Sequence, residues 1–149
     1  MRSRSVASAA PSRQAVARRA ALAAALHDAL SDNVHAEPDV LPSALIEATL
    51  RRSSLGLIEA VRQARIAPDD NVLVVVDQFE ELFRFKRAKG DAQAEADAAA
   101  FVKLLIEVLQ QDAVPIYVML TMRSDFLGDC AQFRGLPEAM NDSQYLIPR

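Results

Sequence analysis

The chain has no tryptophan, one cysteine and only four glycines among 149 residues. A single cysteine, Cys130, makes neither an internal disulfide nor a cysteine-based metal cluster. The glycines do not form the G-x-x-x-x-G-K-[ST] pattern, in which backbone amides and a lysine hold nucleotide phosphates; they are Gly56, Gly90, Gly128 and Gly135. No apolar run approaches about 18 residues, so we expect no membrane contact.

Positive charge is concentrated at the beginning of the chain. Residues 1–19 contain five arginines and no acid, while the whole chain carries a net charge of −3, so the remaining residues carry −8. This balance gives no reason to expect nucleic acid as a partner and is typical of a cytoplasmic protein. We expect residues 1–19 to be a disordered basic tail, with a transit peptide as the alternative, and residues 20–149 to form the domain.

Two apolar runs, at residues 72–76 and 116–122, predict strands with both faces buried, as in a parallel sheet covered by helices on both sides. A short third strand is expected at 145–147. The apolar spacing predicts helices around these strands, at residues 20–30, 43–65, 79–87 and 91–111, with short ones at 125–130 and after Gly135. This alternation of strands and helices predicts an α/β domain.

The first apolar run ends in Asp77, and Gln78, Glu80 and Glu81 follow. Strand ends in a parallel sheet point towards the ligand crevice, where a carboxylate can hold Mg²⁺ and a second one can polarise water. This is the Walker B pattern of nucleotide hydrolases. The alternative is that the aspartate caps a loop and that Glu80 forms a surface ion pair with Arg84.

The second apolar run also ends in polar residues. Thr121 lies near its end, and Arg123, Ser124 and Asp125 follow it. An arginine at such a position can neutralise charge on a terminal phosphate, and the hydroxyl groups of Thr121 and Ser124 can add donors. The alternative is a solvated loop. Two polar strand ends joined by a single helical crossover favour a shared site.

Three blocks of this sequence, VLVVVDQFEELF, LTMRSDFLGDCAQF and QYLIPR, resemble the novel STAND NTPase domain. STAND proteins are P-loop signal-transduction ATPases related to AAA+ proteins, and this version is frequent in bacteria, often beside WD-repeat propellers. The resemblance is close over residues 72–149, looser over 20–65, and does not extend to 1–19.

The resemblance implies roles for individual residues. Asp77 would be the Mg²⁺-linked acid, with Gln78 orienting water beside it. Glu80 or Glu81, with Glu81 favoured, would be the hydrolytic carboxylate, and Arg123 would sense the phosphate. The cofactors implied for the parent domain are Mg²⁺ and ATP, and the partners are other modules or protomers of a STAND assembly.

The resemblance also implies what is lacking. The family's sheet has the strand order 5-1-4-3-2, and this chain would keep strands 3, 4 and 5. We therefore expect a partial three-layer P-loop NTPase fold that lacks its first two strands and the phosphate loop, with residues 1–19 replacing the missing part through truncation or an alternative start. Such a chain would retain neither cofactor and would leave strand edges unpaired beside residues 116–122.

We therefore expect a fragment of a STAND-type ATPase that is unable to bind or hydrolyse ATP alone. The alternative is a non-enzymatic interaction fragment or a degraded gene product. A metal-dependent nuclease built on Asp77 with Glu80 or Glu81 is disfavoured, because the E-x-K pattern is missing: Phe83 stands two residues after Glu81.

Overall fold

The structure, a computed structural model, describes residues 2–6, 15–31, 41–66, 69–83, 92–141 and 143–147. The strands are β1 (Arg2–Val6), β2 (Asp70–Val76) and β3 (Ile116–Leu120). The α-helices are α1 (Ala15–Ser31), α2 (Ser43–Arg52), α3 (Gly56–Gln63), α5 (Ala92–Glu107) and α6 (Leu136–Met140), and the 3-10 helices are η1 (Val108–Gln110) and η2 (Ser124–Gln132).

The three strands form one sheet in the order β1-β2-β3, and both neighbouring pairs are parallel. In the pairing of the two apolar runs, Val72 lies opposite Ile116 and Val76 lies opposite Leu120. The predicted parallel arrangement of these two strands is therefore confirmed. Their carboxyl ends meet at the same edge of the sheet, which is where Asp77 and Thr121 lie.

Strand β1 is an element that the sequence did not predict. The segment expected to be disordered, residues 1–19, contributes a strand and the beginning of α1 at Ala15. In addition, β1 pairs with the flank of β2 opposite β3, with Arg2 beside Asp70 and Val6 beside Val74. Strand β2 therefore has a parallel neighbour on each flank.

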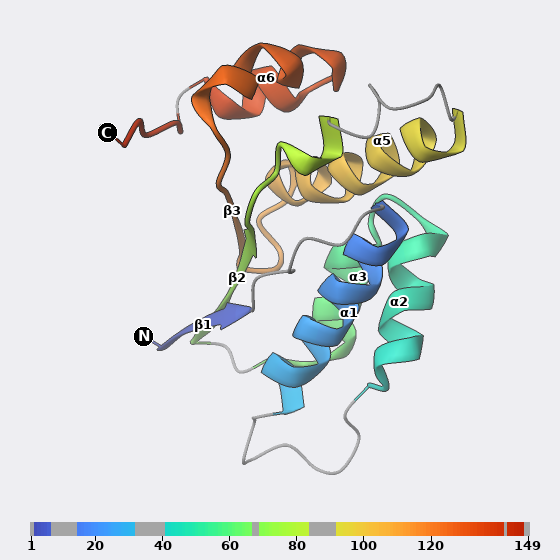
Figure 1. The fold of residues 1–149 in the computed structure, drawn as a ribbon. Helices are drawn as coiled ribbons and strands as arrows, with labels where there is room; N and C mark the ends of the chain where they lie inside the picture. Colours follow the sequence, from blue (N-terminus) through green and yellow to red (C-terminus); the bar gives the residue numbers. More distant parts are fainter. Residues whose placement is uncertain are drawn as a thin grey trace.

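The helices α1, α2, α3 and α5 lie on one side of the sheet (Figure 1). This follows from the topology. Both connections step in the same direction along the sheet, and right-handed crossovers taken in one direction place their helices on the same face. The described residues thus form two layers, where the sequence led us to expect three.

The burial of β2 shows the same asymmetry. Val72, Val74 and Val76 are buried against the helices, whereas Leu73 and Val75 on the opposite face are only partly buried. The expectation that both faces would be buried is therefore wrong for the described part of the molecule. An apolar run without alternation does not by itself reveal that one covering layer is absent.

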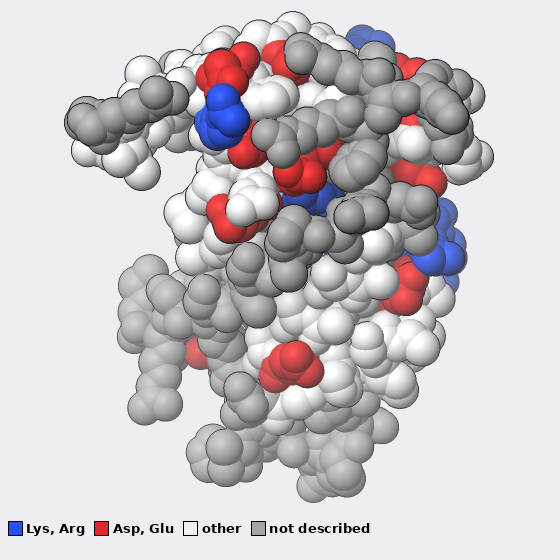
Figure 2. Space-filling view, in the orientation of Figure 1, with Lys and Arg blue, Asp and Glu red and all other residues white. Residues whose placement is uncertain are grey.

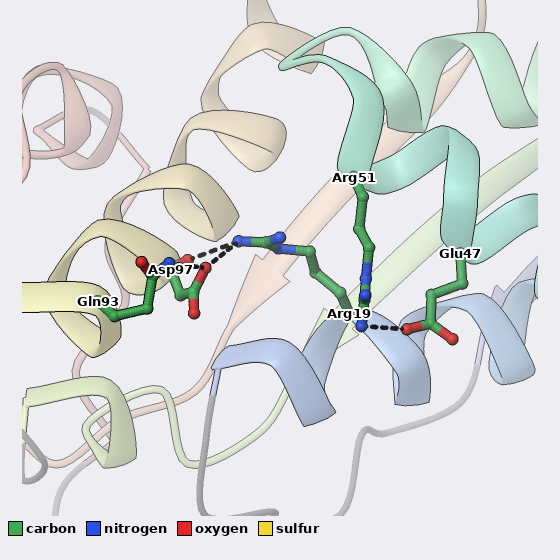
Figure 3. Close-up of polar contacts among 5 residues, drawn as sticks. All are labelled: Arg19, Glu47, Arg51, Gln93 and Asp97. Atoms are coloured by element: carbon green, nitrogen blue, oxygen red, sulfur yellow. Dashed lines mark hydrogen bonds and ion pairs between the residues drawn. The ribbon is translucent and has the colours of Figure 1, made fainter.

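Helix α1 packs into the core through Leu22 and Leu26, which are buried. It is joined to α5 by Arg19, whose Nη2 donates to the backbone oxygen of Asp97 at 3.1 Å and lies 3.3 Å from its carboxylate (Figure 3). The arginine is 7% exposed. It therefore fixes the position of α1 against α5 inside the helical layer.

The predicted helix at 43–65 is interrupted. The structure has two helices, α2 and α3, separated at residues 53–55. Gly56, the first residue of α3, lies directly against the backbone of Thr49 and Leu50 in α2. The glycine therefore permits the close approach of the two helices. On α2, Leu45 is 48% exposed, while Ile46 and Leu50 are buried.

The end of the chain also differs from expectation. Residues 145–147 form no strand, and their side chains are exposed: Tyr145 by 86%, Leu146 by 66% and Ile147 by 83%. The described sheet offers no partner strand at that position. Helix α6 follows Gly135, which has a φ of 85°, and ends at Met140 as predicted.

No helix in the described part of the chain combines the length and apolarity that a bilayer crossing requires. On the face shown in Figure 2, acidic side chains of the described residues occur at several separate places, with basic ones beside some of them. Among the described residues, Arg51 pairs with Glu47 and Arg52 with Glu59, each at 2.7 Å.

Candidate functional site

The two predicted polar strand ends are in contact. The hydroxyl of Thr121 donates a hydrogen bond to Oδ1 of Asp77 and accepts one from the backbone N–H of Gln78 at 3.2 Å. The backbone of Thr121 is bonded as well, to Val76 at 3.0 Å and to Phe79 at 2.8 Å. The strand end after β3 therefore fixes both the carboxylate and the turn that follows it.

The chain after Asp77 turns sharply. Gln78 has a φ of 51°, in the left-handed region that few non-glycine residues occupy. The following N–H groups bond three residues back, from Glu81 to Gln78 at 3.0 Å and from Phe83 to Glu80 at 3.0 Å. This tight turn leaves Asp77 and Gln78 exposed at the edge of the sheet. Backbone strain of this kind is often found at binding sites.

Aromatic side chains hold this turn against the loop after β3. Phe79 and Phe83 are buried and contact each other edge to face, with ring centroids 5.6 Å apart. Phe83 also stacks on Phe126, with ring centroids 6.1 Å apart, and its ring centroid lies 5.8 Å from that of Phe133. Both strand ends of the site are thus fixed to one aromatic cluster.

Arg18, on α1, contacts the same turn. Its Nη2 donates to the backbone oxygen of Gln78 at 3.0 Å and its Nη1 to that of Asp77 at 3.4 Å. The side chain is only 1% exposed. Burial lowers the pKa of the Arg18 guanidinium, while the negative charges of Glu81, Glu80 and Asp77 oppose that lowering. Arg18 is thus a buried cation enclosed by the acidic turn.

Sequence reasoning did not identify Arg18, although a signal for it exists. Arg18 precedes Leu22 and Leu26 at intervals of four residues, so it extends the apolar stripe of the helix. A charged residue on such a stripe is almost never fully buried unless it is paired. The position could therefore have been assigned a buried acidic or carbonyl partner instead of a place in a disordered tail.

The two candidate hydrolytic carboxylates differ in environment. Glu80 is 6% exposed, and its buried Oε2 has no hydrogen-bond partner among the residues that the structure describes. Glu81 is partly exposed. The negative charges of Glu80 and Glu81 both act on Arg18, so both carboxylates lie near the turn. Glu81 is the more accessible of the two to solvent.

Arg123 directly precedes η2, two residues after Thr121. Its guanidinium forms a two-point ion pair with Asp125, with distances of 3.1 Å and 2.8 Å, and lies 5.8 Å from the centre of the Phe126 ring. Both partners are more than half exposed. Arg123 is therefore held locally at the surface.

In the same 3-10 helix, burial raises the pKa of the Cys130 thiol, with a smaller contribution from Asp129.

The donor set suits magnesium in part. An exposed carboxylate, that of Asp77, stands beside the hydroxyl of Thr121. Mg²⁺ commonly takes one or two carboxylates, keeps several waters and completes its shell with phosphate oxygens. Within the described ranges no three His, Cys, Asp or Glu side chains are grouped as a metal site. These residues therefore fit a magnesium ion that is shared with a phosphate ligand.

Comparison with known proteins gives one match. The family model described as Novel STAND NTPase 1 matches residues 2–149, which includes the N-terminal segment that the resemblance was expected to exclude. No curated protein and no solved structure matched the chain. With two parallel strands ending at Asp77 and Thr121 and a family match over nearly the whole sequence, the chain belongs to the Novel STAND NTPase 1 family.

Proposed function

We propose that this chain carries the Walker B and phosphate-sensing part of a STAND-type ATPase and that it has little nucleotide affinity by itself. The observation that carries the proposal is the hydrogen bond between Asp77 and Thr121, which joins the ends of two parallel strands in a member of an NTPase family. Ligand sites in open parallel sheets lie beyond the carboxyl ends of the strands.

Asp77 would hold Mg²⁺, which when bound neutralises phosphate charge. Thr121 would keep the carboxylate oriented, because its hydroxyl donates to Oδ1. Gln78, exposed and held in its left-handed conformation, would orient a water molecule. Its own backbone is fixed by Arg18, which also neutralises part of the acidic charge of the turn.

Glu81 is the better candidate for the carboxylate that polarises water, because it is the more exposed of the two glutamates. Glu80 is buried near Arg18 and is better suited to holding that arginine. Arg123 would sense a terminal phosphate by releasing the carboxylate of Asp125 and binding the phosphate in its place. An exposed arginine–carboxylate pair is worth little in water, so a phosphate could replace the carboxylate at low cost.

The missing phosphate loop sets the expected affinity. The chain has no G-x-x-x-x-G-K-[ST] sequence whose backbone could bind the phosphates. Only the residues at the end of the sheet are then available to bind a nucleotide. In isothermal titration with Mg-ATP we expect a dissociation constant weaker than about 1 mM. Saturable binding in the micromolar range would show that the affinity does not depend on such a loop.

A separate experiment tests the metal site at weak affinity. Mn²⁺ added in place of Mg²⁺ should broaden the NMR signals of the backbone amides of Asp77, Gln78 and Thr121 before those of other residues. A paramagnetic ion broadens the signals of the nuclei closest to it. Asp77→Asn should abolish this selectivity, whereas Asp125→Asn, which removes another exposed carboxylate nearby, should preserve it. Broadening centred elsewhere would contradict the assignment of Asp77.

The wider role is part of the same proposal. In the parent protein this domain would bind ATP, hydrolyse it slowly and switch an assembly of modules or protomers, with WD-repeat propellers as one associated module and a bacterial cytoplasm as the setting.

A non-enzymatic interaction role for the chain itself is favoured by one observation. Apolar residues are exposed along β3, with Tyr117 exposed by 58% and Met119 by 47%.

A further inference from the structure

The charge of Arg18 acts on the acidic turn from its buried side. The guanidinium donates to the backbone oxygens of Gln78, at 3.0 Å, and Asp77, at 3.4 Å. These bonds end on the main chain, so they leave the positive charge of the guanidinium to act on the carboxylates of the turn. The side chain is 1% exposed, and water therefore screens that charge poorly.

Three carboxylates interact with this charge. Burial lowers the pKa of the Arg18 guanidinium, and the negative charges of Glu81, Glu80 and Asp77 oppose that lowering. A guanidinium stays protonated in proteins even when it is buried, so its charge is permanent. The three acids and the arginine therefore form one charge cluster, to which the turn contributes the acids and α1 the cation.

The net charge of this cluster depends on Arg18. Three carboxylates and one guanidinium give −2, and the carboxylates alone would give −3. The affinity of a protein site for a divalent cation depends on the number of negative charges around the ion. Arg18 therefore weakens the attraction of the turn for a free metal ion. The same positive charge attracts phosphate groups.

Arg18 does not occupy the ligand position itself. It reaches the turn from α1 as a buried side chain, whereas Asp77 and Gln78 are exposed at the edge of the sheet. The carboxylate of Asp77 is bonded to the hydroxyl of Thr121 on the neighbouring strand end. A ligand beyond the edge of the sheet would therefore be influenced by the charge of Arg18 without touching it.

We propose that Arg18 determines the form in which the site accepts magnesium: it disfavours free Mg²⁺ and favours Mg²⁺ already bound to the phosphates of a nucleotide. The complex of Mg²⁺ with a nucleoside triphosphate is negatively charged, so the buried cation attracts it, whereas it repels the bare ion. The inference rests on the proposed function, because it takes Asp77 as the residue that holds the metal. Arg18 is thus a specificity-determining residue.

Titration with Mn²⁺ alone tests the first half of the proposal. The broadening of the amide signals of Asp77, Gln78 and Thr121 gives the apparent dissociation constant of Mn²⁺ at the turn. In Arg18→Met this constant should fall by about tenfold or more, because one unit of positive charge near the ion is removed. Damage to the turn would raise the constant, so a fall cannot come from misfolding.

Arg19→Met is the matched control. Arg19 is the next residue of α1 and is also buried, at 7% exposure, but its charge is paired with Asp97 of α5 at 3.3 Å. Its removal should leave the affinity of the turn for Mn²⁺ unchanged. An equal gain in affinity in Arg18→Met and Arg19→Met would show that losing any buried arginine has this effect, and would overturn the proposal.

A second background guards against unfolding of Arg18→Met. Glu80→Gln alone makes the cluster less negative, so its affinity for Mn²⁺ should fall by about tenfold. Adding Arg18→Met restores the wild-type net charge and leaves no uncompensated acid at position 80, so the affinity should return to that of the wild type. A double variant that binds Mn²⁺ no more tightly than Glu80→Gln would overturn the proposal.

Titration with a preformed complex of Mn²⁺ and inorganic triphosphate tests the second half. The ratio of the affinity for this complex to the affinity for Mn²⁺ alone should be about tenfold lower, or less, in Arg18→Met than in the wild type. A purely structural role would lower both affinities and leave their ratio unchanged, which would overturn the inference and leave the metal site in place. Selective broadening that is absent from the wild type and from every variant would refute Asp77 as the metal ligand, and with it both the proposed function and this inference.

Discussion

Replacing Arg18 with methionine should lower the free energy of unfolding by about 3–5 kcal/mol, the cost of removing one partner from a buried charge cluster. The guanidinium is 1% exposed and bonds the backbone oxygens of Asp77 and Gln78. Without it, two carbonyl groups lose a donor and the buried Glu80 loses its nearby cation. Urea denaturation followed by circular dichroism measures the loss.

Two further variants separate charge from packing. Arg18→Met combined with Glu80→Gln should recover part of the lost stability, because the uncompensated buried charge is removed with the arginine. Arg51→Met is the matched control. Arg51 pairs with Glu47 at 2.7 Å, but its side chain is 49% exposed, so the loss should stay below about 1 kcal/mol. Equal losses for Arg18→Met and Arg51→Met would contradict the buried role of Arg18.

Replacing Gly56 with alanine should destabilise the protein by about 3 kcal/mol, at the upper end of typical overpacking effects. A Cβ at this position would lie 2.8 Å from the Cα of Leu50 and 3.0 Å from the carbonyl carbon of Thr49, and closer still to the oxygen of Thr49. All three are backbone atoms, which no side-chain rotation can move. Helices α2 and α3 would have to separate, and thermal unfolding would report it.

Gly128→Ala provides the control for Gly56. Gly128 lies in η2, and a Cβ there meets no atom within 4 Å. We expect its unfolding free energy to change by about 0.5 kcal/mol or less, as for ordinary surface substitutions. If Gly56→Ala were equally harmless, the close approach of α2 and α3 would not exist in solution.

The sequence was informative where local chemistry and tertiary structure agree. Apolar runs at residues 72–76 and 116–122 predicted two neighbouring parallel strands, and the structure has them. Gly135 predicted the beginning of α6, because its positive φ suits a left-handed turn. In such cases the residues themselves carry the signal.

The sequence was uninformative where a partner decides the structure. Strand β1 has no apolar pattern, so its conformation depends on the unpaired backbone of β2 rather than on its own side chains. Residues 145–147 have strand-like side chains, but they pair with no strand of the described sheet. The break before Gly56 arises from contact between two helices, which the apolar spacing does not encode.

The pairing of β1 with β2 also affects the order in which the protein can fold during synthesis. Arg2 pairs with Asp70, so β1 must wait during synthesis for a strand that is made much later. Contacts so distant in sequence form slowly, because a long loop must close first. Until β2 emerges, the N-terminal segment has no place in the sheet, and the helices that follow it must form first. Strand β1 is therefore a segment that a cotranslational chaperone or protease would meet unfolded.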